Sequence, residues 1–326
     1  MDLFLLICIC ICICSYFFHF FIYNDNRPKP YELEIEADPD ISIDTVGLDA
    51  SIEKAIQYLW DLDANRLIPD RDYSINVQKG KKPYYKGDHA SDPLFTHVER
   101  EVFRRPTYST FIKLLDNYSH QVGVDEVVTH EEVMENKHFI NAIMETAPMQ
   151  YCHKYCVANI PDIPTSKSGF KQLLHTIWFQ LYRRTRENKD SSGFEHVFLG
   201  EIKNGQVTGF HNWIQFYLEE QKGNLDYFGY IKPRSRTDAR TDDDDHLLTL
   251  QFKWYGVMKK LGSMFVGVSP EFEMALYTLC FLMGKETYQF CLSTGEEAFE
   301  MKIKCFTMAK NKIGTSYPEI LHHYED

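Results

Sequence analysis

The spacing of apolar residues changes along the chain and divides it into two halves. From Leu48 to about Arg186 the apolar positions recur every three or four residues, which is typical of helices that pack on one face. Turn signals or a proline separate four such stripes, which are Ile52, Ile56, Leu59 and Trp60; Phe111, Leu114, Leu115 and Tyr118; Phe139, Ile140, Ile143 and Met144; and Leu173, Leu174, Trp178 and Leu181. The first half is therefore predicted to be mainly helical.

After Gly193 the apolar positions alternate with polar ones, which predicts β-strands over residues 248–254 and 299–305. Two helices interrupt these strands. One runs from about Asn212 to Gln221, and the other begins at residues 269–271, where Ser, Pro and Glu supply an N-cap, a first helical proline and an acidic first turn. Helices followed by a mixed, mainly antiparallel β-sheet define an α+β fold.

Asn204-Gly205 lies between two β-prone runs, and this dipeptide is the strongest short signal for a two-residue hairpin. Strands that continue in that register would place His196 and His211 on the same face, because side chains alternate along each strand. The two imidazoles would then be diagonal neighbours, roughly 7–8 Å apart. Such a gap could hold one reacting group between an acid and a base.

Two imidazoles on one face suit proton transfer. An unperturbed histidine titrates near pH ~6.5, so one ring can accept a proton while the other donates one. The alternative is that one or both histidines simply pack in the core. Glu195 and Glu201 would face the opposite side of the strand, where they could orient the site indirectly, bind a cation or be solvated.

The composition indicates a well-packed globular protein, because 44% of the 326 residues are hydrophobic and 25% are charged. The net charge of -12 argues against a protein held to nucleic acid by diffuse positive charge. A local basic groove could still bind RNA, and two clusters could supply it: Lys232, Arg234, Arg236 and Arg240, and Arg183, Arg184 and Arg186. The run Asp242 to Asp245 could bind a cation, although a solvated loop is the simpler interpretation.

Residues 3–23 form an apolar run in which only His19 is ionisable. At ~1.5 Å per residue, such a run could cross the ~30 Å hydrocarbon layer of a membrane. We expect residues 1–23 to be a signal peptide or signal anchor and residues 24–46 an acidic, proline-containing linker. Residues 47–322 would form the folded domain, helical at 47–190 and β-rich at 191–322. The protein would enter the secretory pathway and be secreted or held by a single membrane span.

The sequence does not decide on which side of the membrane the folded domain lies. Arg27 and Lys29 follow the apolar run and favour a cytoplasmic domain, whereas the glycosylation triplet at Asn117 favours the lumen. Of nine cysteines, five lie outside the run, so at least one is free if all disulfides are internal. Cys152 and Cys156 are expected on one helix face as buried thiols rather than as metal ligands.

Several short motifs occur in order over residues 48–321. In the second half they are Glu195-His196-Val197-Phe198, Gly209-Phe210-His211-Asn212-Trp213, Trp254-Tyr255-Gly256-Val257-Met258-Lys259, Ser269-Pro270-Glu271-Phe272-Glu273 and Gly314-Thr315-Ser316-Tyr317-Pro318. In the first half they are Leu59-Trp60-Asp61 and Arg104-Arg105-Pro106-Thr107-Tyr108. With these motifs the chain resembles the EndoU family of endoribonucleases, which prefer to cleave RNA at uridylates.

The resemblance implies a catalytic triad of two histidines and one lysine, which fall here on His196, His211 and Lys259. His211 would be the base that takes a proton from the ribose 2′-hydroxyl, and His196 the acid that protonates the leaving 5′-oxygen. Lys259 would stabilise the charge on the phosphorane oxygens. RNA carries its own nucleophile, so a base, an acid and a cation around one phosphate suffice for this chemistry. The products would carry 2′,3′-cyclic phosphates.

The resemblance also implies further residues and a cofactor. Ser263, Thr315 and Tyr317 match positions that recognise the uracil base and pack the sugar, and Glu195 and Glu201 match acidic residues that support activity. Dependence on manganese (Mn2+) is implied as well, with its ligands unassigned. The expected partner is single-stranded, uridine-containing RNA, and the protein is expected to be a monomer.

Two other interpretations remain open. A non-catalytic RNA-binding protein on the same scaffold would bind oligouridine without cutting it, although the complete triad argues against this. A metal hydrolase would use Glu195, His196, Glu201 and the Asp242 to Asp245 run, but these residues lack compact ligand spacing.

Overall fold

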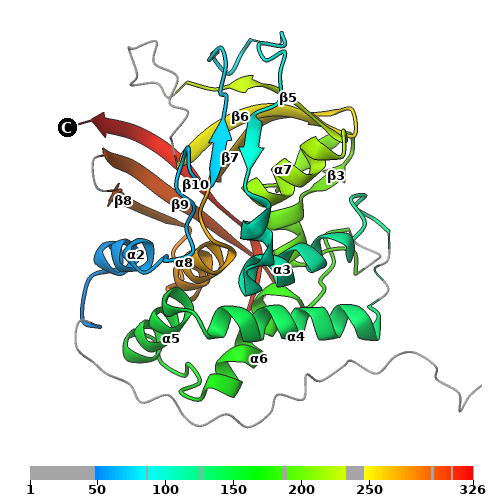
Figure 1. The fold of residues 1–326 in the computed structure, drawn as a ribbon. Coiled ribbons are helices and arrows are strands. Elements are labelled where there is room, and N and C mark those ends of the chain that lie inside the picture. Colours follow the sequence, from blue (N-terminus) through cyan, green and yellow to red (C-terminus); the bar gives the residue numbers. More distant parts are fainter. Residues whose placement is uncertain are drawn as a thin grey trace, which may run out of the picture. The chain divides into compact units, whose positions relative to one another are not determined.

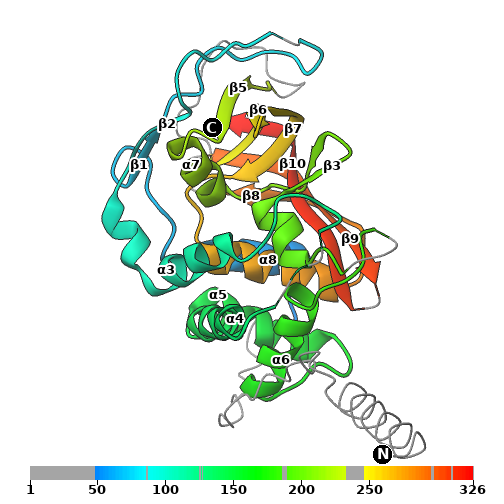
Figure 2. The same ribbon diagram turned by 90° about the vertical axis from the view of Figure 1, so that its right-hand side faces the viewer.

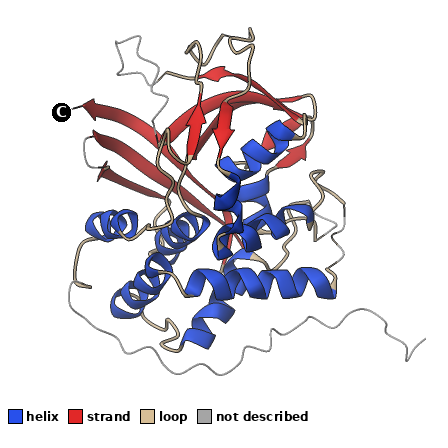
Figure 3. Ribbon diagram, in the orientation of Figure 1, coloured by secondary structure: helices blue, strands red, loops and turns tan. Residues whose placement is uncertain are grey.

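Helices and strands separate in space, with the helices gathered on one side of the described part and the strands on the other (Figure 3). The computed structural model describes residues 48–85, 87–124, 126, 128–185, 189–232, 246–294, 297–309 and 311–325. The predicted membrane segment and linker, with Arg186, Arg234, Arg236, Arg240 and the Asp242 to Asp245 run, lie outside these residues. Within the described residues no helix has the length and apolar character needed to cross a membrane.

Among the described residues, five α-helices form most of the first half (Figure 1). They are α2 (Ile52–Asp61), α3 (Pro106–Lys113), α4 (His130–Met144), α5 (Ala147–Asn159) and α6 (Lys167–Trp178), with 3₁₀ turns η1 (Arg100–Arg104) and η2 (Leu114–Asp116). Their predicted apolar stripes face inward, and Ile56, Phe111, Ile140 and Leu174 are all buried. A short antiparallel pair that was not predicted, β1 (Tyr73–Ile75) and β2 (Phe95–Val98), also lies in this half.

Two antiparallel sheets dominate the second half, in the orders β5-β6-β7 and β10-β9-β8. Their strands are β5 (Leu225–Tyr230), β6 (Leu247–Trp254), β7 (Val257–Phe265), β8 (Thr287–Ser293), β9 (Glu297–Ala309) and β10 (Lys312–Glu325). The strands predicted over 248–254 and 299–305 lie within β6 and β9. The helix predicted near residues 212–221 is α7 (Trp213–Gln221). The α+β prediction is therefore confirmed.

Helix α8 (Pro270–Leu282) lies between the helices and the sheets (Figure 2). It begins as predicted, because Pro270 is its first residue and the Ser269 Oγ atom accepts a hydrogen bond from the Phe272 amide at 3.1 Å. Its first eleven residues are all buried, since α5 packs on one side and β9 on another. Cys152 and Cys156 on α5 are buried and free, as predicted.

The Asn204-Gly205 hairpin is confirmed. It joins β3 (Glu201–Lys203) to β4 (Gln206–Thr208) in the expected register, with Ile202 opposite Val207. Both turn residues have positive φ angles, 51° and 71°. A type I′ turn requires such angles, and asparagine and glycine adopt them most easily.

The two strands do not continue to the histidines, so that part of the prediction is wrong. The chain forms a π-helical turn, η3 (Glu195–Leu199), ahead of β3. After β4, Gly209 has a φ of 63°, and a Cβ atom there would lie 1.7 Å from the His196 carbonyl oxygen. Only glycine allows this approach. The two segments still meet, because the His211 amide donates a hydrogen bond to the Val197 carbonyl at 2.8 Å.

Candidate active site

A cleft of about 790 Å³ contains the predicted catalytic and substrate-binding side chains. It is lined by residues from β4, β6, β7 and β10 and from neighbouring loops, including His196, His211, Lys259, Ser263, Thr315 and Tyr317. The catalytic candidates are nearly buried, because both histidines are 6% exposed and the lysine 8%. Residues from 196 to 317 thus converge on one polar cleft, which is how binding and catalytic sites are usually built.

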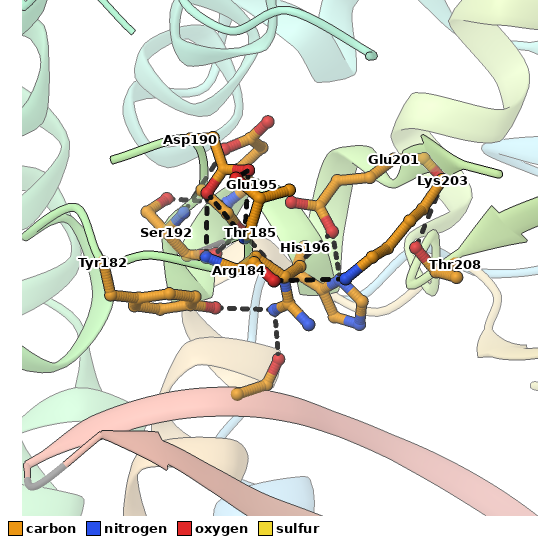
Figure 4. A network of polar contacts seen from close by, with 12 residues as sticks. Tyr182, Arg184, Thr185, Asp190, Ser192, Glu195, His196, Glu201, Lys203 and Thr208 are labelled. Atoms are coloured by element: carbon orange, nitrogen blue, oxygen red, sulfur yellow. Dashed lines mark hydrogen bonds and ion pairs between the residues drawn. The ribbon is translucent and has the colours of Figure 1, made fainter. Parts of the chain in front are cut away.

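His196 is held by a buried carboxylate. Its Nδ1 atom lies 2.5 Å from the Oε2 atom of Glu201, which is completely buried (Figure 4). The ionised carboxylate can only accept, so Nδ1 carries the proton and Nε2 is left for other chemistry. Burial lowers the pKa of His196 to about 4, against the opposing effect of Glu201. The prediction that Glu201 faces away from His196 is wrong, because the π-helical turn replaces the strand.

Glu201 in turn lies beside Arg184, whose Nε atom is 3.2 Å from the same carboxylate oxygen. Burial would raise the pKa of Glu201, but the hydrogen bond from His196 and the guanidinium charge keep it below its usual value. Arg184 also donates from Nη2 to the Gly314 carbonyl on β10 at 2.7 Å. Arg184 belongs to a cluster that could supply a basic groove for RNA, but its side chain is only 10% exposed and pairs with Glu201.

His211 is held by a different partner. Its Nδ1 atom donates a hydrogen bond to the Ser263 carbonyl on β7 at 2.8 Å, so the neutral ring keeps its lone pair on Nε2. The ring of Tyr317 stacks on it, with centroids 4.7 Å apart. Burial and the charge of Lys259 hold the pKa of His211 well below its ordinary value of 6.5. His211 is therefore a neutral acceptor at physiological pH.

Lys259 points its ammonium group at the loop between the two histidines. Its Nζ atom donates a hydrogen bond to the Gly209 carbonyl at 2.6 Å. Burial lowers the pKa of Lys259 to about 8, and the group stays mostly charged at pH 7. The same charge lowers the pKa of both His196 and His211, so the three groups share one electrostatic environment.

The remaining predicted residues divide into two groups. On β7, the Ser263 hydroxyl lies 3.0 Å from the Thr249 hydroxyl, and Thr315 and Tyr317 are on the neighbouring part of β10. Glu195 does not line the cleft. It is buried, and burial together with the charge of Glu201 raises its pKa well above the usual value.

The cleft residues do not form a metal-binding set. Within the described part of the chain, no three His, Cys, Asp or Glu side chains are grouped closely enough to hold a metal ion. In the cleft, the Nδ1 atoms of His196 and His211 each form a hydrogen bond within the protein, and Glu319 is paired with Lys302 at 2.7 Å. Of the donor set considered for a metal hydrolase, Glu195 does not line the cleft and Glu201 is paired with His196 and Arg184, while Asp242 to Asp245 lie outside the described residues.

The protein has an α+β fold and a cleft that contains two imidazoles and one ammonium group. These features define a class of proteins that can transfer protons to and from the oxygens attached to a phosphate. Comparison with known proteins identifies the family, because residues 51–318 match the family described as endoribonuclease XendoU. The chain belongs to this family and is an endoribonuclease. The predicted family is therefore confirmed.

Two characterised relatives illustrate the similarity. Uridylate-specific endoribonuclease B of Danio rerio is 44% identical over 277 residues, covering 83% of this chain and 96% of the relative. Poly(U)-specific endoribonuclease of Xenopus tropicalis is 46% identical over 286 residues, covering 85% and 96%. The solved structure of XendoU, titled a splicing independent snoRNA processing endoribonuclease, superposes with a TM-score of 0.72 at 42% identity, over 85% of this chain and 99% of that one.

Proposed function

We propose that the protein cleaves single-stranded RNA on the 3′ side of uridylates and leaves 2′,3′-cyclic phosphate ends. One observation carries this proposal. His196 and His211 both engage their Nδ1 atoms with protein acceptors and line the same cleft as the Lys259 ammonium group. Each ring therefore keeps one nitrogen, Nε2, for a proton of the substrate. The names of the relatives support uridylate as the preferred nucleotide.

His211 is the base in this mechanism. Its Nδ1 partner is a neutral carbonyl, and burial and Lys259 favour the uncharged ring. The Nε2 atom takes the proton of the ribose 2′-hydroxyl while the 2′-oxygen forms a bond to phosphorus. A positioned base of this kind contributes roughly 10²–10⁴-fold to the rate.

His196 is the acid. Its Nδ1 partner is an ionised carboxylate, and the negative charge of Glu201 favours the imidazolium over the neutral ring. Burial lowers the pKa of His196 to about 4, and a bound phosphodiester would add a second negative charge near the ring and raise this pKa again. Nε2 then gives its proton to the 5′-oxygen as the bond between that oxygen and phosphorus breaks. The different partners of the two rings thus separate their roles.

Lys259 stabilises the negative charge that grows on the two non-bridging oxygens of the pentacoordinate phosphorus. Its ammonium group is a compact charge, is 8% exposed and is fixed by the Gly209 carbonyl. A charge held in place before the reaction needs no reorganisation when the transition state forms. This makes Lys259 the electrostatic part of the site.

Recognition of the base is assigned to β7 and β10. The exposed part of the Tyr317 ring can pack against the sugar or the base, and the Ser263 and Thr315 hydroxyls can hydrogen-bond to the uracil edge. These roles, dependence on manganese, a monomeric state and entry into the secretory pathway stay predictions. The glycosylation triplet does not support lumenal placement, because the Nδ2 atom of Asn117 is buried.

The test is a cleavage assay on short RNAs of uridine-only, cytidine-only and adenosine-only sequence, with and without Mn2+. Mass spectrometry should find uridine 2′,3′-cyclic phosphate ends, and a 2′-deoxy substitution at the cleaved nucleotide should block the reaction. Protein that binds oligouridine in the presence of Mn2+ and never cuts it would instead be a non-catalytic RNA-binding protein. Cleavage that survives the double change of His196→Ala and His211→Ala would refute the mechanism.

A further inference from the structure

The loop between β1 and β2 carries an aromatic pair that the cleavage mechanism does not use. Tyr84 is 68% exposed, more than any other large apolar or aromatic side chain in the described residues, and Tyr85 is 50% exposed. Their rings lie 5.0 Å apart, at 38° to one another. Leaving two adjacent tyrosine rings in water is unfavourable, and such surfaces usually bind a partner.

The loop is firmly attached to the catalytic sheet at β5 (Figure 2). The Lys81 amide donates to the Tyr230 carbonyl at 2.8 Å. The Lys81 ammonium group is buried and donates to the Gly87 and Phe228 carbonyls at 2.8 and 2.6 Å, and to Gln251 at 2.6 Å. Lys81 is thus unavailable to a ligand, but it fixes the position of the exposed residues that follow it.

The same loop reaches the catalytic cleft. Pro83, directly before the two tyrosines, lines the cleft together with Lys232, which follows β5. The Lys232 side chain lies against the loop, because a Cβ atom on Gly80 would come within 2.5 Å of its Cε atom. No carboxylate among the described residues pairs with Lys232, whereas Lys302 in the same cleft is paired with Glu319. Among the described residues, the cleft surface therefore extends from His196 to Lys232 and Pro83, and Pro83 directly precedes the aromatic pair.

We propose that Tyr84 and Tyr85, with Lys232, form a second nucleotide-binding subsite that stacks a base beyond the two nucleotides joined by the cleaved bond and contacts its phosphate. Exposed aromatic rings beside lysines are the usual means of binding single-stranded nucleic acid, because every base has a face that can stack. This subsite gives affinity with little base preference, and the cleft selects the uridine. It explains how a protein of net charge -12 holds RNA through a few local contacts.

The inference rests on the proposed function, and its test separates the two. The full-length protein is given a dinucleotide, uridylyl-(3′,5′)-adenosine, and a ten-nucleotide RNA with one uridine in the middle. For the double variant Tyr84→Ala/Tyr85→Ala, kcat/KM on the long RNA relative to the dinucleotide should fall about 10-fold, equivalent to about 1.4 kcal/mol of stacking. Tyr84→Phe/Tyr85→Phe keeps both rings and should restore most of the ratio.

Binding is measured separately, by fluorescence anisotropy with the same ten-nucleotide RNA carrying 2′-deoxyuridine so that it cannot be cut. The alanine variant should bind it about 10-fold more weakly, and Lys232→Ala should lower the salt dependence of log Kd by about one ion. Tyr58→Ala, which removes an exposed tyrosine of α2 that contacts the ring of Tyr151 and does not line the cleft, is the matched control and should change neither quantity.

The outcomes are distinct. If wild-type protein cuts neither RNA, the proposed function fails, and the anisotropy measurement still decides the subsite. If the alanine variant loses both substrates equally, or binds the uncut RNA as tightly as wild type, the two tyrosines have another role and the subsite does not exist.

Discussion

The ring of Tyr317 lies nearly parallel to the ring of His211, with centroids 4.7 Å apart and an angle of 12° between the planes. One face of the His211 ring is therefore covered by an aromatic side chain from β10. Because the Nδ1 atom of His211 is fixed by Ser263, the stack restricts the remaining rotation of the ring. We therefore expect Tyr317 to position His211 as well as to contact the substrate.

Replacing Tyr317 should separate these two effects. Tyr317→Ala removes the stack on His211, so we expect kcat to fall about 10-fold. We also expect KM to rise, since stacking of a nucleobase on an aromatic ring is worth ~1–3 kcal/mol. Tyr317→Phe keeps the ring and should retain most of kcat. Steady-state kinetics on a uridine dinucleotide measure both constants, and an unchanged kcat for the alanine variant would show that the stack does not position His211.

Replacing Glu201 should impair the acid. Glu201→Gln keeps the shape but removes the charge that favours imidazolium, so the pKa of His196 should fall further. We expect kcat/KM to drop by about 10²-fold at pH 7, and its decline with rising pH to begin at lower pH. The pH profile is the decisive measurement, because a merely structural role would lower activity equally at every pH. Glu101→Gln, on the exposed η1 turn, is the control.

Gly209 should tolerate no side chain. A Cβ atom there would collide with the His196 carbonyl, and the φ of 63° is unfavourable for alanine by ~1–2 kcal/mol. Gly209→Ala should therefore lower the free energy of unfolding by about 2 kcal/mol or more and abolish cleavage. Gly205→Ala shares the positive φ but meets nothing within 4 Å, so it should cost about 1 kcal/mol and leave cleavage intact. Equal effects of the two changes on activity would contradict this.

Burial of neutral His196 should make stability depend on pH. The folded pKa is about 4 and the unfolded pKa near 6.5, so the unfolded chain binds more protons between these values. Stability from this residue is complete above about pH 6.5 and is lost as the pH falls towards 4. Over that range wild type should lose up to ~1.4 kcal/mol per pH unit relative to His196→Asn. Urea unfolding of both proteins at several pH values measures this difference, and parallel pH dependences of the two would contradict it.

Part of the site could be predicted from the sequence because it depends only on the backbone preferences of neighbouring residues. Asn204 and Gly205 need only their own backbone preferences to form the turn, so the hairpin register follows directly from the dipeptide. The start of α8 follows likewise from Ser269 and Pro270. The hairpin was also the basis for predicting that the two histidines lie close together, although the strand register used for that prediction does not extend to them.

Other features depend on contacts between distant segments and had no local signal. The alternation of His196 and Phe198 resembles a strand, but this segment forms a π-helical turn, and the backbone of Gly209 packs closely against the His196 carbonyl. That turn brings Glu201 to the ring of His196, which strand parity places on the opposite face. In the sequence, nothing distinguishes Arg184 from an exposed arginine. In the fold, its side chain is enclosed by contacts with Gly314 on β10 and with Glu201.

The Ser263 carbonyl accepts the hydrogen bond from His211, the proposed base, and the Ser263 hydroxyl, which we propose contacts the nucleotide, lies at the same position on β7. A nucleobase that fits poorly and displaces β7 would also tilt the imidazole ring of His211, which accepts the proton in the proposed mechanism. The protein would then discriminate among the four nucleotides by the rate at which it cleaves bound RNA, and not only by the affinity with which it binds RNA. A non-cognate RNA could thus occupy the cleft and leave it undamaged.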